Sequence, residues 1–209
     1  MKPGDGFPVR SPDMQALVVI AHPCSDSFTH AAAMSAIGGL EHAGHRVDVI
    51  DLYAEGFRAA MSLPERLAYD TDDPVVDPQV ADHTRRVLSA EILVFVYPTW
   101  WSGLPAILKG WLERVMVPGV GFTFDERSGK VEPGLRHVRR IVGISTYGSP
   151  RLAVRAVNDN GRRVLVRALR MSCGWRVRTR WLALYAMDSA SEDDRRQFLD
   201  RVEHRMRAT

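Results

Sequence analysis

Two short, unbroken apolar runs constrain the fold of this chain more than any other feature. Residues 16–21 (Ala-Leu-Val-Val-Ile-Ala) and 92–96 (Ile-Leu-Val-Phe-Val) are rich in β-branched residues and show no polar alternation. A half-buried strand alternates with a period of two, so runs without alternation predict strands that are buried on both faces. Strands of this kind belong to parallel sheets, whose crossover helices cover both sides. The chain is therefore expected to form an α/β fold.

The rest of the chain alternates strand and helix patterns in the same way. We predict further strands at 47–52, 141–144 and 181–185, and helices at 29–43, 63–69, 79–89, 106–115 and within 152–171, with a last helix capped by Ser191. The helix within 152–171 is expected to break near 158–161, and 121–124 and 130–132 are expected to form a hairpin. Five strands joined by helices predict a three-layer α/β/α sandwich around a parallel sheet of order 2-1-3-4-5.

The length of 209 residues suits one domain. Residues 1–15 contain several Pro and Gly without a period, which predicts a flexible N-terminal arm, and 16–209 then form the folded domain. No apolar run is long enough to cross a bilayer, and no export signal is recognisable. Cys24 and Cys173 have neither metal-ligand spacing nor the density of a disulfide scaffold. We therefore expect a cytoplasmic protein with no metal site and no membrane insertion.

The net charge is only +3, but the positive charge is concentrated in one part of the chain. Between Arg136 and Arg180 there are twelve Arg and a single acid, Asp159. Such a cluster is typical of a surface that binds phosphates, or of a solvated face that a neighbouring subunit offsets. Because no aromatic interleaving or nucleic-acid-binding motif accompanies the charge, we expect no nucleic-acid partner.

Polar loops follow the first, third and fourth predicted strands. The first loop, 22–29, leads into a helix, and the unpaired N–H groups and positive dipole of a helix N-terminus favour an anion. Ser25, Ser27 and Thr29 add hydroxyl groups to this loop, and His22 adds a titratable ring. Ordinary capping of the helix by Ser27 would give the same pattern, so this loop by itself leaves both interpretations open.

The second loop, 98–103 (Pro-Thr-Trp-Trp-Ser-Gly), places two indoles after a buried strand. Pro98 ends the ladder because it has no N–H to donate, and Trp100 and Trp101 stand between Pro98 and Gly103. Core tryptophans seldom lie in a loop bracketed in this way, although core packing is the alternative. The third loop, 145–149, should lie beside the second. At the switch point of such a sheet, the three loops predict a cleft for a flat ligand with an anionic tail, which fits a flavin.

These motifs resemble those of the flavodoxin-like NAD(P)H:quinone oxidoreductases. The resemblance rests on Ala21-His22 followed by Ser27-Phe28-Thr29, and on the long run from Pro98 to Trp111. It covers most of the chain from Ala16 onwards and implies a flavodoxin-like fold and a homodimer. It also implies a ping-pong reaction in which NAD(P)H gives a hydride to flavin N5, and N5 passes the hydride to a quinone or similar flat electrophile.

The resemblance assigns roles to residues of all three loops. The flavin phosphates would be held by His22, Ser27, Phe28 and Thr29, the ring by Pro98, Thr99, Trp100, Trp101, Ser102 and Gly103, and the far edge of the ring by Ser145, Thr146, Tyr147 and Gly148. Phe122 and Phe124 occupy the place of aromatics that line the partner subunit's substrate pocket, and Trp100 would narrow that pocket. We expect FAD rather than FMN, because the long segments after the second and third strands could cover an adenosine arm.

The third loop departs from the family pattern. The best-known quinone reductases have Thr-Thr-Gly-Gly there, followed by a Tyr and a His proposed to relay protons, whereas this chain has Ser145-Thr146-Tyr147-Gly148 and no His behind it. Tyr147 is therefore the candidate catalytic residue, either as a proton donor or through packing on the ring. Two other functions stay open: a flavin-binding regulatory subunit of a partner such as a membrane transporter, and a flavodoxin-type electron carrier.

Overall fold

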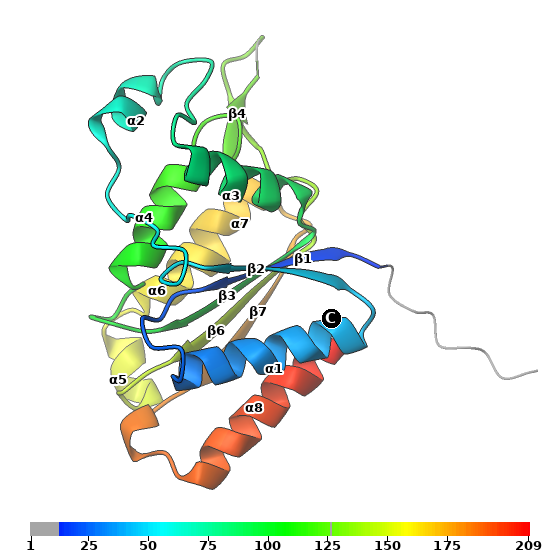
Figure 1. Cartoon of the computed structure of the whole chain (residues 1–209), viewed down its shortest axis with the longest axis vertical. Helices are drawn as coiled ribbons and strands as arrows, with labels where there is room; N and C mark the ends of the chain where they lie inside the picture. The colour runs from blue at the N-terminus through cyan, green and yellow to red at the C-terminus, as the bar shows by residue number, and fades with distance from the viewer. Residues whose placement is uncertain (1–12, 126) are drawn as a thin grey trace, which may run out of the picture.

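A five-stranded parallel sheet forms the middle layer of the computed structural model, which describes residues 13–125 and 127–209 (Figure 1). Its strands are β1 (Gln15–Ile20), β2 (Arg46–Asp51), β3 (Ile92–Pro98), β6 (Arg140–Thr146) and β7 (Arg178–Leu184). They lie in the order β2-β1-β3-β6-β7, and all neighbours pair in parallel. Counted without the hairpin strands, this is the order 2-1-3-4-5, so the predicted topology is confirmed.

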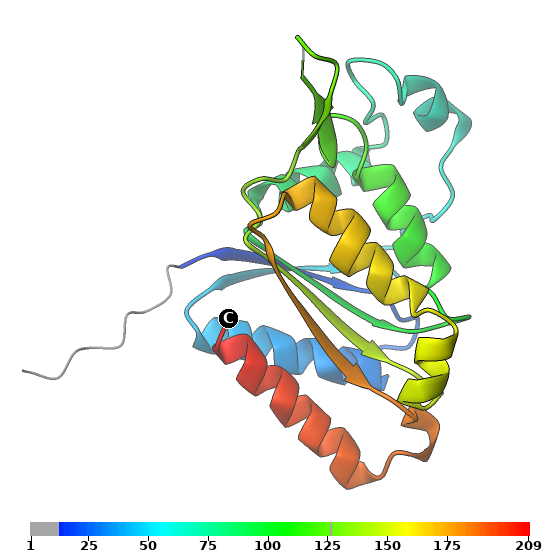
Figure 2. The same cartoon turned by 180° about the vertical axis from the view of Figure 1, so that it is seen from behind.

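Helices cover both faces of the sheet (Figures 1 and 2). One face carries α1 (Phe28–His42) and α8 (Glu192–Arg207), which pack against each other. The other face carries α3 (Pro78–Ser89), α4 (Ala106–Val115) and a broken helix composed of α6 (Asn160–Arg163), the π-helix η1 (Val164–Leu169) and α7 (Arg170–Cys173). The remaining elements are α2 (Leu63–Ala68), α5 (Arg151–Ala156), the 3₁₀ turn η2 (Met187–Ser189) and a hairpin of β4 (Phe122–Phe124) and β5 (Val131–Pro133).

The strand side chains divide between two apolar cores. Val18 and Val94 pack in the core beneath α1 and α8, whereas Leu17 and Phe95 pack in the core beneath α3 and α4. All four are fully buried. Covering the sheet on both faces is the physical reason why these runs show no polar alternation. None of the described helices is long and apolar enough to span a bilayer.

Two boundaries differ from those expected. β1 begins at Gln15 and Met14 is buried, so the last residues of the predicted N-terminal arm belong to the folded domain. Residues 1–12 of that arm lie outside the described residues. β7 begins at Arg178 rather than at 181. β7 lies at the edge of the sheet, where an Arg side chain can reach solvent, and the charged residues obscured the strand pattern in the sequence.

Two local predictions are confirmed. Ser191 caps α8 by accepting a hydrogen bond from the Asp194 N–H, and the Asp194 carboxylate accepts one from the Ser191 N–H. The helix between residues 151 and 173 is interrupted where expected, because Asn158 and Asp159 have φ angles of 77° and 44°. A right-handed helix cannot pass through left-handed residues, so α5 ends before them and α6 begins after them.

Candidate functional site

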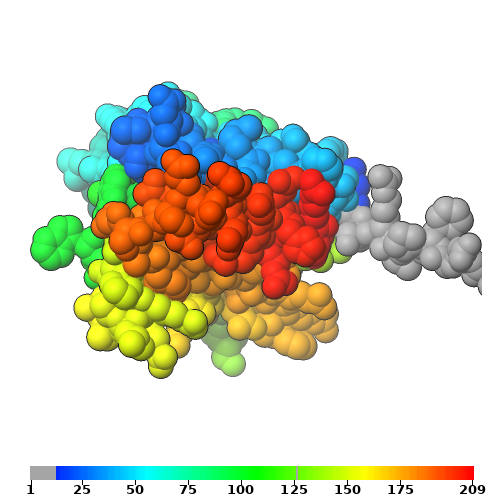
Figure 3. Space-filling view, turned by 90° about the horizontal axis from the view of Figure 1, so that it is seen from below, coloured from blue at the N-terminus to red at the C-terminus, as the bar shows by residue number. Residues whose placement is uncertain are grey.

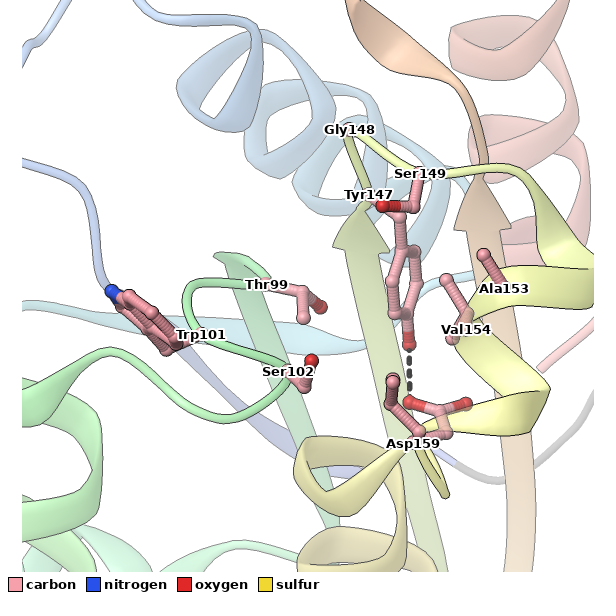
Figure 4. A pocket seen from close by; sticks show the side chains of 10 residues that line it. Thr99, Trp101, Ser102, Tyr147, Gly148, Ser149, Ala153, Val154 and Asp159 are labelled. Atoms are coloured by element: carbon pink, nitrogen blue, oxygen red, sulfur yellow. Dashed lines mark hydrogen bonds between the residues drawn. The ribbon is translucent and has the colours of Figure 1, made fainter.

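A pocket of about 340 Å³ lies at the carboxyl ends of β3 and β6 (Figure 4). It is lined by the two loops that follow these strands and by α5 with its following turn: Thr99, Trp101, Ser102, Tyr147, Gly148, Ser149, Ala153, Val154, Val157 and Asp159. The Thr99 N–H donates to the Thr146 carbonyl over 2.8 Å, and the Thr99 and Ser145 hydroxyls hydrogen-bond at 2.9 Å. The second and third loops therefore meet, as the sheet order predicts.

The second loop is a two-residue turn with an unusual backbone. Trp100 and Gly103 exchange N–H···O bonds, while Trp101 and Ser102 between them have φ angles of 47° and 57°. Two left-handed central residues make a type I′ turn, which normally uses Asn or Gly. The turn leaves the Trp101 side chain fully exposed, and Figure 3 shows the green segment near residue 100 projecting from the surface.

Trp100 takes a different direction from Trp101. Its side chain is 40% exposed, and its ring centroid lies 6.0 Å from that of His22 in the first loop. Trp100 is not among the residues that line the pocket, whereas Trp101 is. In the single chain, Trp100 thus lies between the first and second loops, and its predicted role in narrowing the substrate pocket stays a prediction.

The side chains of the first loop are mostly engaged by protein groups. The His22 Nδ1 accepts a hydrogen bond from the Cys24 N–H, and the Ser27 hydroxyl caps α1 by accepting from the His30 N–H. The Phe28 ring packs against Phe198 at 5.9 Å, and Thr29 is buried. What this loop presents to a ligand is therefore chiefly the backbone N–H groups of the first turn of α1.

The third loop brings Tyr147 under the pocket. Tyr147 is buried, its ring stacks on Tyr185 at 4.8 Å, and its hydroxyl donates to the Asp159 Oδ1 over 2.9 Å. Burial and the neighbouring Asp159 carboxylate raise the pKa of Tyr147 far above its ordinary value. Gly148 lies beside Asp188, whose Oδ2 would be 2.8 Å from a Cβ at this position, so a larger residue there would displace the Asp188 carboxylate.

Asp159 is a pocket residue that sequence reasoning missed. It belongs to the turn 158–161 (Asn-Asp-Asn-Gly). The turn residues predicted a break in the helix, but they gave no sign that Asp159 would line a pocket. A Cβ at Gly161 would lie 3.1 Å from the Gly103 carbonyl carbon and 3.3 Å from the Tyr97 hydroxyl. The turn therefore packs directly against the second loop, and the missing side chain of Gly161 allows this approach.

Phe122 and Phe124 do not join the pocket of their own chain. Their rings contact each other at 5.6 Å on the hairpin, and Phe124 is 58% exposed. Figure 2 shows the hairpin beside the α7 end of the broken helix, away from α5 and the pocket. There Phe122 lines a separate apolar groove together with Met171 and Trp175, both largely exposed, which sequence reasoning did not single out.

The chain belongs to the flavodoxin-like fold family, whose model matches residues 14–208. It is 31% identical over 150 residues to NAD(P)H dehydrogenase (quinone) 1 of Cavia porcellus, covering 65% of this chain and 54% of that protein. The chain thus spans about half the length of the first curated relatives it matches. It is also 26% identical over 202 residues to human ribosyldihydronicotinamide dehydrogenase (quinone), covering 87% of this chain and 86% of that protein.

Solved structures agree with this membership. NAD(P)H:quinone oxidoreductase from Methanothermobacter marburgensis superposes with a TM-score of 0.78 at 26% identity, covering 93% of this chain and 98% of the other. The FMN complex of an FMN-dependent NADH-azoreductase from Bacillus anthracis gives a TM-score of 0.66 at 17% identity, covering 92% and 97% of the two chains, and shows a shared fold.

Proposed function

We propose that this protein is a flavin-dependent NAD(P)H oxidoreductase that delivers two electrons to a quinone or a similar flat electrophile. The observation that carries the proposal is the pocket at the carboxyl ends of β3 and β6, walled by the tryptophan turn and by Tyr147. The first loop does not line this pocket, but its His22 ring lies 6.0 Å from the ring of Trp100 in the tryptophan turn. Relatives named NAD(P)H dehydrogenase (quinone) and NAD(P)H:quinone oxidoreductase support the same activity.

The residues present fit a flavin. The turn at Trp101 and Ser102 adopts a left-handed backbone that non-glycine residues avoid, and strain of this kind persists where a ligand site requires it. We assign the flavin phosphates to the first turn of α1 with His22, Ser25, Ser27, Phe28 and Thr29, the ring to residues 98–103, and its far edge to residues 145–148. When bound, a flavin supplies the N5 atom that takes a hydride from NAD(P)H and gives it to the acceptor in a ping-pong sequence.

Within this scheme the chain itself orients the ring and supplies a proton. The hydrogen bond between the Thr99 and Ser145 hydroxyls fixes the spacing of the second and third loops, so their backbone N–H groups present a rigid edge to the ring. Tyr147 is the proton donor that we assign to the acceptor, since its phenol lines the pocket.

We propose FAD as the flavin. The connection between β2 and α3 includes α2 and is anchored on α4, because buried Arg114 pairs with Glu65 of α2 and with Asp77 at the start of α3. An ordered connection of this length can cover an adenosine arm, which FMN lacks.

We further propose a homodimer in which each hairpin completes the other chain's pocket. Trp101 is fully exposed, and the apolar side chains of Phe124 and Trp175 are exposed at a distance from the pocket of their own chain. Large apolar side chains grouped on a surface are typical of protein–protein interfaces. The described cysteines Cys24 and Cys173 are free thiols, which suits the cytoplasm that we propose.

The proposal is tested by the absorption spectrum of the purified protein, analysis of the released cofactor, and anaerobic addition of NADPH. We expect a yellow protein that releases FAD and is bleached by NADPH within seconds, and that is reoxidised by a quinone such as menadione. Release of FMN would show that the choice of FAD is wrong but would leave the proposed function standing. A protein that binds neither flavin would overturn the function, and a flavoprotein that reduces no quinone would leave a regulatory or electron-carrier role.

A further inference from the structure

Five arginines gather around a cavity at the opposite end of the sheet from the pocket that we assign to the flavin. The cavity has a volume of about 540 Å³ and is lined by Arg140, Arg170, Arg176, Arg178 and Arg180. It lies where β6 and β7 begin, and Figure 2 shows the start of β7 between the end of α7 and the C-terminal end of α8. At the rise of a parallel strand, the two ends of β6 are about 20 Å apart, so this cavity is separate from the flavin pocket.

Three of these arginines lack a partner among residues 13–125 and 127–209. Within those ranges, Arg140, Arg176 and Arg178 form neither an ion pair nor a side-chain hydrogen bond. The guanidinium of Arg176 lies over the ring of Trp175, 5.0 Å from its centroid. Such stacking orients the plane of a guanidinium and leaves the N–H groups on its edge free to bind an anion.

A second cavity adjoins the first and shares the same three arginines. It has a volume of about 550 Å³ and is also lined by Arg140, Arg176 and Arg178. The carboxylate that lines it, Glu91, lies 3.0 Å from the Arg139 guanidinium and is already neutralised. Unpaired guanidinium groups that line a hollow suit a small anion that enters it, whereas a lipid bilayer presents a broad surface.

The positive charges of this region repel one another. Arg140 is half-buried, and burial together with the charges of Arg178, Arg180 and Arg139 lowers its pKa below the ordinary value. Like charges held this close destabilise the compact state. An anion bound among them removes the repulsion and accepts the hydrogen bonds that the guanidinium groups otherwise lack.

Protection of the sheet edge explains only part of this charge. Charged side chains on an edge strand prevent another strand from pairing with it, and Arg178 and Arg180 of β7 satisfy that need. Arg140 begins β6, which is paired on both sides, and Arg170 and Arg176 lie outside the strands. What the five arginines have in common is the cavity rather than the edge.

We propose that this cavity binds an anion with two linked phosphate groups, either free pyrophosphate or the diphosphate of a nucleotide. Guanidinium groups bind phosphate oxygens through pairs of N–H groups, and two linked phosphates offer enough oxygens for all three unpaired arginines. Arg170 and Arg180 donate to the Trp175 and Arg205 carbonyls and add positive charge around them. The site goes beyond the proposed function and does not depend on it, because it requires no flavin.

The proposal is tested by isothermal titration of pyrophosphate into the purified full chain. We compare the wild type with R140Q, R178Q and the control R196Q, an exposed arginine at the start of α8, whereas the end of α8 lines the cavity. R140Q and R178Q should each weaken binding by about tenfold or more, because each removes charged hydrogen bonds to the anion. R196Q should bind as the wild type does, and added salt should weaken binding to both.

Thermal unfolding separates anion binding from a structural role of these arginines. Pyrophosphate should raise the Tm of the wild type and of R196Q but not that of the double variant R140Q/R178Q, since a ligand stabilises only a fold that binds it. Without the anion, R178Q should not lower the Tm, because the exposed Arg178 repels its neighbours. R178Q therefore tests the proposal even if the half-buried Arg140 cannot be replaced without unfolding.

Two further ligands identify the source of the diphosphate. Inorganic phosphate should bind more weakly than pyrophosphate. Tighter binding of ADP than of pyrophosphate would assign the site to a nucleotide, and the reverse order would assign it to free diphosphate. The proposal is overturned if pyrophosphate does not bind, or if R178Q and R196Q bind it equally well. Tighter binding of single-stranded DNA than of either ligand, lost in R178Q, would make the surface a nucleic-acid site instead.

Discussion

Two polar regions of this molecule are built in opposite ways. The charged groups around Arg114 are paired with one another. The Arg114 guanidinium donates to the Glu65 carboxylate over 2.6 Å, to the Asp77 carboxylate over 2.8 Å and to the Arg58 carbonyl. Arg114 is only 2% exposed, so each of these bonds is shielded from water. Nearby, buried His83 bonds the Glu55 carboxylate and accepts from the Trp111 indole in the same manner.

The pocket shows the reverse. Its lining includes left-handed Trp101, Ser102 and Asp159, its largest aromatic side chain is fully exposed, and the buried hydroxyl of Tyr97 behind it has no partner among the described residues. The Arg114 region therefore follows the rules for a stable fold, whereas the pocket breaks several of them together. Departures of this kind concentrate where a protein meets a ligand, because the surrounding fold supplies the stability that they cost.

The largest effect should come from breaking the Arg114 region. Arg114→Met leaves the buried Glu65 carboxylate without its cation and removes one of the two arginines that pair with the partly buried Asp77. We expect it to lower the free energy of unfolding by about 3–5 kcal/mol. Urea unfolding followed by circular dichroism measures this change. Arg139→Ala removes an exposed pair with Glu91 and should cost less than about 1 kcal/mol. If Arg114→Met and Arg139→Ala lowered the free energy of unfolding by similar amounts, the Arg114 region would not have the special role in stability described above.

A smaller loss of stability is expected when a side chain is added where α4 packs closely in the same region. A Cβ at Gly110 of α4 would lie 2.1 Å from the Ala59 carbonyl oxygen, so Gly110→Ala should destabilise by about 1–3 kcal/mol. The matched control is Gly38→Ala on α1, where a Cβ would meet no atom within 4 Å. Because alanine favours a helix, that variant should gain about 0.5–1 kcal/mol. Thermal unfolding of both variants measures whether each substitution lowers or raises the stability.

The pH dependence of stability sharpens the comparison further. Burial raises the pKa of Glu65, but hydrogen bonds from Ser62 and Arg114 outweigh burial and lower it below its ordinary 4.5, and the pKa of Asp77 is likewise lowered below 3.8. A lowered folded-state pKa contributes stability above the unfolded value, which is lost as the pH falls through the folded value. The free energy of unfolding should therefore drop below about pH 4.5, and Arg114→Met should weaken that dependence.

The smallest effect on stability is expected at the pocket. Trp101 is fully exposed, so Trp101→Ala should change the free energy of unfolding by less than about 0.5 kcal/mol. If residues 98–103 carry the ring as proposed, the same variant should weaken flavin binding by about tenfold, through loss of one aromatic contact. Fluorescence titration of the flavin-free protein measures the affinity. Unchanged flavin affinity would remove Trp101 from the binding site.

Much of the fold followed from local patterns. The unbroken runs at 16–21 and 92–96 predicted buried parallel strands, and the turn signals at 158–161 predicted the break in the helix. The start of β7 was missed because Arg178 breaks an apolar pattern that an edge strand does not require. The sheet order then brought the second and third loops together, as expected.

The sequence by itself determined the layers, the sheet order and the edge at which the loops gather, because these depend on periodicity and on short-range backbone preferences. Only the tertiary structure decided which polar groups meet. Tyr147 bonds Asp159 twelve residues away, and Arg114 bonds Glu65 across 49 residues, whereas Phe122 and Phe124 lie away from the pocket of their own chain. Such pairings depend on how packed elements orient their side chains, and this orientation is set by the three-dimensional core rather than by any local run of residues.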